Sequence, residues 1–225
     1  PKSIRTLKKV KYLTGDLIKK KELKVLKKKF DYVVNAAGVV DHSANENVFK
    51  AHYLGCKNLS DFFLKKKIKL FLQIGSCVEY GPQKSPQKEN FKSKMLDLKS
   101  MYSKGKFAAS QYLMQLHDKY NFPIIVFRLY LNYGPNQDFN RFLPVIIDGC
   151  VRNKKFPCSS GMQYRSFTYI DDLVNAIIIA LKKPELSGNI FNIGNSKPVK
   201  IKKISQYIQK KKNKGTPLYV YVRFR

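Results

Sequence analysis

Acidic residues, paired cysteines and long apolar runs are all scarce in this 225-residue sequence, and each shortage narrows what the protein can be. The cysteines Cys56, Cys77, Cys150 and Cys158 are scattered without a Cys-x-x-Cys pair, which indicates neither a disulfide framework nor a zinc site. No apolar run approaches the roughly 20 residues that a membrane-spanning helix needs, and no charged-then-apolar signal region opens the chain. These shortages predict a soluble protein of the reducing cytoplasm, with no membrane partner and no metal site.

The shortage of acid leaves 15 Asp and Glu against 44 Lys and Arg, a formal net charge of +29. A basic surface can bind nucleic acid. Here, however, the lysines come in short runs beside Leu, Ile and Phe, at spacings that suit the solvated faces of helices. Arginine, which makes bidentate phosphate and base contacts, is scarce beside lysine. We therefore interpret the charge as a compositional bias and expect no nucleic-acid partner, which salt-sensitive binding to arbitrary DNA would contradict.

The sequence does contain enough apolar residues for a sizeable core, because 44 % of it is hydrophobic. Apolar, β-prone runs alternate with longer amphipathic stretches, a pattern typical of a parallel sheet flanked by helices, and therefore of an α/β protein. The expected strands are Val10–Leu13, Tyr32–Asn35, Leu70–Ile74, Ile124–Leu129 and Asn189–Ile193. The expected helices are Lys20–Lys28, Asn47–Lys65, Met101–Tyr120, Phe142–Arg152, Ile170–Lys182 and Ile201–Lys211.

A Tyr-x-x-x-Lys motif, Tyr102 to Lys106, opens one of these expected helices. Four residues make about one helical turn, so the phenol and the ammonium project from the same face. A phenol has a reference pKa near ~10, and a neighbouring ammonium favours its ionised form, which makes Tyr102 a candidate proton shuttle. The alternative is that two surface residues share a face by chance, because lysine is so abundant here.

A small hydroxyl residue, Ser76, follows the expected strand Leu70–Ile74. The carboxyl ends of parallel strands are where α/β sheets bind ligands, so Ser76 could share a substrate oxygen with Tyr102. Taken alone, Ser76 is better explained as a turn or cap residue. The order Ser76, Tyr102, Lys106 favours the functional interpretation.

In this order the motifs resemble the extended short-chain dehydrogenase/reductases, the NAD-dependent epimerase/dehydratase family, from about Val10 to Tyr207. The resemblance implies a Rossmann-like doubly wound parallel sheet that lacks its first βα unit, with a small substrate-binding lobe. Residues 1–131 would form a partial dinucleotide-binding domain. Residues 132–225 would complete the sheet and form part of the substrate lobe.

The resemblance also implies NAD or NADP as cofactor and assigns residues to it. The segment around Asp16 and Leu17 is similar to the one whose Asp contacts the adenine. The small residues that follow the strand Tyr32–Asn35 let the backbone approach the dinucleotide, and Tyr130 lies near the nicotinamide end. The implied cofactor residues are Asp16, Leu17, Ala36, Ala37, Gly38, Tyr102, Lys106 and Tyr130, and the implied catalytic residues are Ser76, Tyr102 and Lys106.

The substrate implied by the resemblance is a nucleotide-diphosphate sugar. Asn132, in a stretch similar to Arg-x-x-x-Asn-x-Tyr-Gly-Pro, would face the substrate together with Ser76. Arg165 matches the arginine of an Arg-Asp-Phe segment that binds the diphosphate, a task suited to a planar and permanently charged fork. Arg141 is a second candidate for the same phosphates. A homodimer is implied for the full-length protein.

Three departures from the family pattern stand out: the pair His52 and Cys56 in one motif, Ser166 in another, and a missing glycine turn. His52 occupies the place of the usual Asn in Asn-x-x-Gly-Thr, Cys56 replaces the Thr of that motif, and Ser166 replaces the usual Asp after the phosphate arginine. The Gly-x-x-Gly-x-x-Gly turn, whose amides hold the pyrophosphate, is absent. We therefore expect the sequence to be a fragment or the product of a truncated reading frame.

The residues after Ser76 bear on the reaction. The 4,6-dehydratases of the family carry Asp-Glu there, whereas Cys77 and Val78 stand here, so dehydration lacks its acid and base. The fucose-synthase type needs a Cys at the place of Val78 and a downstream His, and no His follows His117. What remains is a 4-epimerase or a 4-ketoreductase, in a setting such as polysaccharide biosynthesis. The alternative is a truncated non-catalytic remnant or binding module of the same fold.

Overall fold

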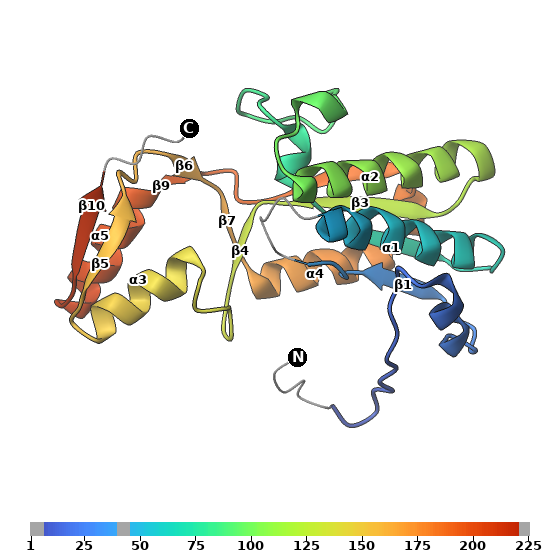
Figure 1. The fold of residues 1–225 in the computed structure, drawn as a ribbon, viewed down its shortest axis with the longest axis horizontal. Helices are drawn as coiled ribbons and strands as arrows, with labels where there is room; N and C mark the ends of the chain where they lie inside the picture. Colours follow the sequence, from blue (N-terminus) through green and yellow to red (C-terminus); the bar gives the residue numbers. More distant parts are fainter. Residues whose placement is uncertain (1–6, 40–45, 221–225) are drawn as a thin grey trace. The chain divides into compact units, whose positions relative to one another are not determined.

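The computed structural model describes residues 7–39 and 46–220, together with the side chains of all of these except Val220 (Figure 1). The chain divides into two compact units. The first unit comprises residues 1–126 and 184–190, and the second unit comprises residues 127–183 and 191–225.

A four-stranded parallel sheet contributes two whole strands and the beginnings of two others to the first unit. Its strands are β1 (Tyr32–Asn35), β2 (Leu70–Ser76), β3 (Ile124–Leu129) and β8 (Asn189–Ile193), in the order β1-β2-β3-β8. Strands β1 and β2 run parallel, with Tyr32 opposite Leu70 and Asn35 opposite Gln73. Residues 70–73 of β2 and 124–128 of β3 are buried, as expected for apolar strands that are covered on both faces. The predicted α/β class with a parallel sheet is confirmed.

Two long helices, α1 (Glu46–Leu64) and α2 (Met101–Tyr120), pack against each other in the first unit (Figure 1). Helix α2 begins at a capping box, in which the Ser100 hydroxyl accepts a hydrogen bond from the Ser103 amide at 3.0 Å. It ends at Asn121, which adopts a left-handed conformation with φ 51°. The core between these helices and the sheet is apolar, and its largest buried members include Phe63, Phe71, Leu113, Ile124 and Val126.

The described residues of the second unit form three helices and several short strands. The helices are α3 (Phe142–Val151), α4 (Ile170–Leu181) and α5 (Ile201–Lys212). The strands pair as β4 (Leu131–Tyr133) with β7 (Phe167–Tyr169), β5 (Lys155–Ser159) with β10 (Thr216–Val220), and β6 (Tyr164–Arg165) with β9 (Val199–Lys200). The first two pairs are parallel and the third is antiparallel.

Two expected elements differ from the structure. The expected strand Val10–Leu13 is not a strand: none of the described strands pairs with it, and Val10 is 49 % exposed. A β-prone run needs a neighbouring strand for its backbone groups, and composition alone does not supply one. The expected helix Lys20–Lys28 is instead a short 3-10 helix, η1 (Lys20–Val25), with Leu23 as its one buried residue. A single apolar anchor among lysines gives too little burial to extend it.

Among the described residues, no helix is long and apolar enough to cross a membrane, and no three or more His, Cys, Asp or Glu side chains gather as a metal site would require.

Candidate active site

Helix α2 brings Tyr102 and Lys106 together on one face. The Lys106 Nζ lies 5.9 Å from the centroid of the Tyr102 ring. The same ammonium donates a hydrogen bond of 2.7 Å to the carbonyl oxygen of Ile74, near the end of β2. Lys106 is only 5 % exposed, so this is a buried cation anchored to the sheet rather than a solvated surface lysine.

The electrostatics of Lys106 reflect two opposing effects. Burial lowers the pKa of its ammonium, because the charged form loses its hydration. The carboxylate of Glu79, which is fully buried, raises that pKa again, as does the neighbouring Cys56.

Ser76 ends β2 and also caps the 3-10 helix η2 (Cys77–Tyr80). Its hydroxyl oxygen accepts a hydrogen bond of 3.4 Å from the Val78 amide, while the Glu79 Oε1 accepts one of 2.7 Å from the Ser76 amide. Because Lys106 binds the carbonyl of Ile74, two residues earlier, Ser76 and Lys106 are tied to the same strand end. Ser76 is 8 % exposed.

His52, on α1, also belongs to this cluster. Its ring lies edge-on to Tyr102, with centroids 4.9 Å apart and planes at 89°. Its Nε2 is 2.7 Å from the carbonyl oxygen of Val39. Burial, with the positive charge of Lys106 as the second cause, lowers the pKa of His52 from 6.5 to about 4, so the ring is neutral at physiological pH. The sequence marked His52 as a departure from the family pattern, but did not place it among the site residues.

A buried amide network holds the loop after β1. The Asn35 side-chain amide donates to the Gln73 Oε1 at 2.7 Å, and the Cys56 thiol donates to the same oxygen at 3.2 Å. The Asn35 Oδ1 in turn accepts from the Ala37 amide at 3.2 Å. Burial raises the pKa of the Cys56 thiol to about 12, so it remains protonated and able to donate. Cys56, which replaces the Thr of the family motif, therefore still supplies a hydrogen-bond donor to Gln73.

The segment that carries Asp16 and Leu17 is fastened to helix α1. The Asn58 side-chain amide donates to the carbonyl oxygens of Leu17 and Ile18, both at 2.9 Å. The Asp16 Oδ1 accepts from the Ile18 amide at 2.9 Å and so closes its own turn. Asp16 is half-buried, and Leu17 packs against the core.

Two features of the structure concern the residues predicted to hold a dinucleotide. Ala36, Ala37 and Gly38 are exposed, and their small side chains leave the backbone open to a flat ligand. The buried ammonium of Lys106 lies beside the ring of Tyr102, which is also predicted to contact the cofactor.

The other predicted residues, Tyr130, Asn132, Arg141 and Arg165, belong to the second unit. The Asn132 amide donates to the Tyr130 carbonyl at 3.3 Å, and its Oδ1 is buried without a hydrogen-bond partner. Arg165 is exposed and donates to the Tyr164 carbonyl at 2.8 Å. Arg141 occupies the N-cap position of α3, where its side chain makes no capping bond.

Ser166, the other departure from the family pattern, has a structural role in the second unit. Its hydroxyl donates to the Asn195 carbonyl at 3.0 Å and accepts from the Asn195 amide at 2.7 Å. Gly194 lies so close that a Cβ there would be 2.7 Å from the Ser166 Oγ and 3.0 Å from the Tyr130 ring. The small serine and the glycine together allow this close packing.

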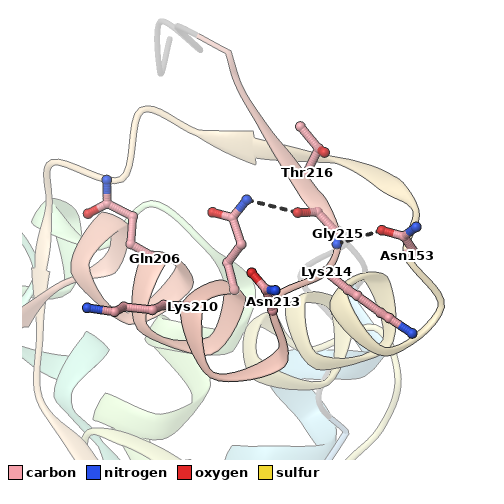
Figure 2. A pocket seen from close by; sticks show the side chains of 8 residues that line it. Asn153, Gln206, Lys210, Asn213, Lys214, Gly215 and Thr216 are labelled. Atoms are coloured by element: carbon pink, nitrogen blue, oxygen red, sulfur yellow. Dashed lines mark hydrogen bonds between the residues drawn. The ribbon is translucent and has the colours of Figure 1, made fainter.

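The second unit also contains a hollow of about 390 Å³ beside the end of α5, shown in Figure 2. The Gln209 amide donates to the Gly215 carbonyl at 2.9 Å, and the Gly215 amide donates to the Asn153 Oδ1 at 3.0 Å. These bonds close the turn after α5, and none of the predicted site residues lines the hollow.

The model of the NAD dependent epimerase/dehydratase family matches residues 2–194. The chain therefore belongs to this family. It is 30 % identical over 190 residues to a dTDP-D-glucose 4,6-dehydratase of Dictyostelium discoideum, covering 75 % of this chain and 42 % of that protein. The human protein of the same name is 30 % identical over 131 residues, covering 58 % of this chain and 37 % of the relative. The chain thus spans less than half the length of these relatives.

Solved structures share the fold. A UDP-N-acetylglucosamine 4-epimerase from Methanobrevibacter ruminantium, in complex with UDP-N-acetylmuramic acid, has a TM-score of 0.85 at 21 % identity, over 94 % of this chain and 70 % of that one. A dTDP-glucose 4,6-dehydratase from Bacillus anthracis, in complex with NAD, has a TM-score of 0.83 at 21 % identity, over 94 % and 68 %.

Proposed function

We propose that the full-length protein is an NAD(P)-dependent nucleotide-sugar 4-epimerase or 4-ketoreductase. The observation that carries this proposal is the buried Lys106 ammonium, which lies beside Tyr102 and is hydrogen-bonded to the strand end that bears Ser76. Burying the ammonium of a lysine is costly, and such groups concentrate at functional sites.

Each residue has a distinct task in this proposal. Tyr102 exchanges the proton of the sugar C4 oxygen, and the Ser76 hydroxyl donates a hydrogen bond to the same oxygen. Lys106 lowers the pKa of Tyr102 and orients the ribose of the cofactor. A bound nicotinamide supplies or accepts the hydride. Asp16, Leu17 and the exposed loop of Ala36, Ala37 and Gly38 hold the dinucleotide, with Tyr130 near its nicotinamide end.

The residues after Ser76 support a reaction without dehydration, although the relatives include proteins named 4,6-dehydratases. Elimination of water needs an acid and a base, and Cys77 and Val78 stand where the dehydratases of the family carry the Asp-Glu pair that supplies them. Glu79 is a carboxylate close by, but it is fully buried and accepts the Ser76 amide hydrogen bond. Glu79 therefore serves the capping box and the charge balance of Lys106.

The second unit supplies the proposed substrate contacts. Arg165 and Arg141 are candidates for the diphosphate of a nucleotide sugar, since a guanidinium binds phosphate in a bidentate manner. Asn132 has a buried Oδ1 without a hydrogen-bond partner, which a donating hydroxyl of the sugar would satisfy.

The test is turnover of nucleotide hexoses and their 4-keto forms by the protein made from its complete reading frame. We expect the wild type to bind NAD(H) or NADP(H), and Tyr102→Phe to abolish turnover while retaining cofactor binding. Lys104→Met is the control, because Lys104 is only two residues from Tyr102 on the same helix, and this variant should retain turnover. Undiminished turnover by Tyr102→Phe would refute the mechanism. Cofactor binding without any turnover by the wild type would favour the alternative of a non-catalytic module.

A further inference from the structure

The ring of His52 connects two parts of the first unit that the sequence separates. Its Nε2 is 2.7 Å from the Val39 carbonyl oxygen, in the loop after β1. Because a carbonyl only accepts, Nε2 carries the hydrogen, and this fixes the tautomer of the neutral ring. The other nitrogen, Nδ1, is then an acceptor, and it is buried without a hydrogen-bond partner.

Glycines make room for the side chain of His52 on two sides, Gly38 beside the ring and Gly105 beside the Cβ. A Cβ on Gly38 would stand 2.1 Å from the His52 Cε1 and 2.4 Å from its Nδ1, so any side chain there would overlap the imidazole. Gly38 also has φ 143°, a conformation that side chains rarely adopt. On α2, a Cβ on Gly105 would lie 3.0 Å from the His52 Cβ. The ring is therefore closely enclosed between the loop and the helix.

The third contact of the ring is with Tyr102, edge-on at 4.9 Å between centroids. We propose that His52 is a positioning residue that fastens the Gly38–Val39 backbone through Nε2 and orients the Tyr102 phenol through its ring. This inference rests on the proposed function, because it assigns the loop to the cofactor and Tyr102 to proton transfer. His52 would then hold the loop at Gly38–Val39 and the phenol of Tyr102 in a fixed position relative to each other.

The identity of the residue matters for this role. The side-chain amide of an asparagine, the residue usual in the family motif, is too short to reach the Nε2 position and has no ring to place against a phenol. A neutral imidazole does both, and it adds no second cation beside Lys106. Burial keeps His52 neutral, with its pKa at about 4.

Two variants of the full-length protein separate the two contacts. His52→Phe keeps a ring against Tyr102 but removes the donor to Val39. We expect hydrogen exchange of the amides at 36–39 to become about tenfold faster, and the dissociation constant for NAD(H) to rise by about tenfold, as for a lost hydrogen bond. Its kcat should stay within about twofold of the wild type.

His52→Gln places an amide nitrogen near the Nε2 position but has no ring. Loop exchange and the NAD(H) dissociation constant should stay within about twofold of the wild type, while kcat falls about tenfold because the phenol loses its orientation. The matched control is His117→Asn, which alters a histidine on α2 whose Nδ1 is 3.0 Å from the Phe122 carbonyl. His117→Asn should change neither kcat nor the dissociation constant for NAD(H).

The outcomes separate this role from a merely structural one. The assignment would be overturned if each variant changed kcat and the dissociation constant by the same factor. It would also be overturned if both variants left kcat and the dissociation constant unchanged. If His52→Phe did not fold, His52→Gln with normal kcat would still overturn it. A wild-type protein that binds no NAD(H) refutes the proposed function. In that case, unchanged loop exchange in His52→Phe also refutes the fastening of Val39, whereas faster exchange supports it.

Discussion

Acid should destabilise this protein through His52, because burial favours its neutral form. The folded-state pKa is about 4, against an ordinary value of 6.5. Between these values the unfolded chain binds a proton that the folded chain does not, so the free energy of unfolding falls as the pH falls. The stabilising contribution is complete above pH 6.5, declines from there to about pH 4, and changes no further below it. At about 1.4 kcal/mol for each pKa unit, the loss amounts to ~3 kcal/mol.

Urea unfolding at pH 7, 5.5 and 4.5 measures this contribution when wild type and His52→Gln are compared. Carboxylates titrate in the same range, but they are common to both proteins and cancel in the difference. The free energy of unfolding of the wild type should fall relative to that of the variant by ~2 kcal/mol or more by pH 4.5. A difference between the two proteins that stayed constant across this range would refute the reasoning.

Three further predictions concern neighbouring groups. Glu79→Gln keeps an acceptor for the capping hydrogen bond but removes the negative charge that raises the pKa of Lys106. Lys106 should then lose its proton at lower pH, so turnover should begin to fall at lower pH on the alkaline side of the pH-rate profile. An unchanged pH-rate profile would contradict this prediction. Gly38→Ala forces a Cβ to within 2.1 Å of the His52 ring and should cost about 3 kcal/mol in urea unfolding, whereas a cost below ~1 kcal/mol would contradict the enclosed ring. Ser166→Ala removes two hydrogen bonds to one backbone turn and should lower the free energy of unfolding by about 1 to 2 kcal/mol. Thermal unfolding of the variant with the same midpoint temperature as the wild type would contradict this prediction.

The sequence predicted the long helices and the sheet strands well because their signals are strong and local. Helix α2 begins and ends at the predicted residues, Met101 and Tyr120, since a serine capping box precedes it and a left-handed Asn121 follows it. Strands β1 and β3 also have their predicted bounds. The one-turn spacing of Tyr102 and Lys106 placed both side chains on one helical face, as the contact between them requires.

Long-range contacts are what the sequence did not predict. Val10–Leu13 has the composition of a strand, but no described strand pairs with it. Strands β6 and β9, two residues each, are too short for any periodicity to be visible. The contact of His52 with Tyr102 joins residues 50 positions apart on two helices, and only the packing of α1 against α2 creates it.

Ser76 shows why structural and catalytic interpretations of one residue need not compete. A hydroxyl has one hydrogen to donate and two lone pairs to accept with. The cap uses a lone pair, because the Val78 amide donates to the Ser76 Oγ at 3.4 Å. Capping does not consume the hydroxyl hydrogen, which is the group that the proposed mechanism directs at the sugar oxygen. The capping box also fixes the end of β2, because the Ser76 amide donates to the Glu79 carboxylate. These contacts give Ser76 the fixed position that the proposed mechanism requires of its hydroxyl.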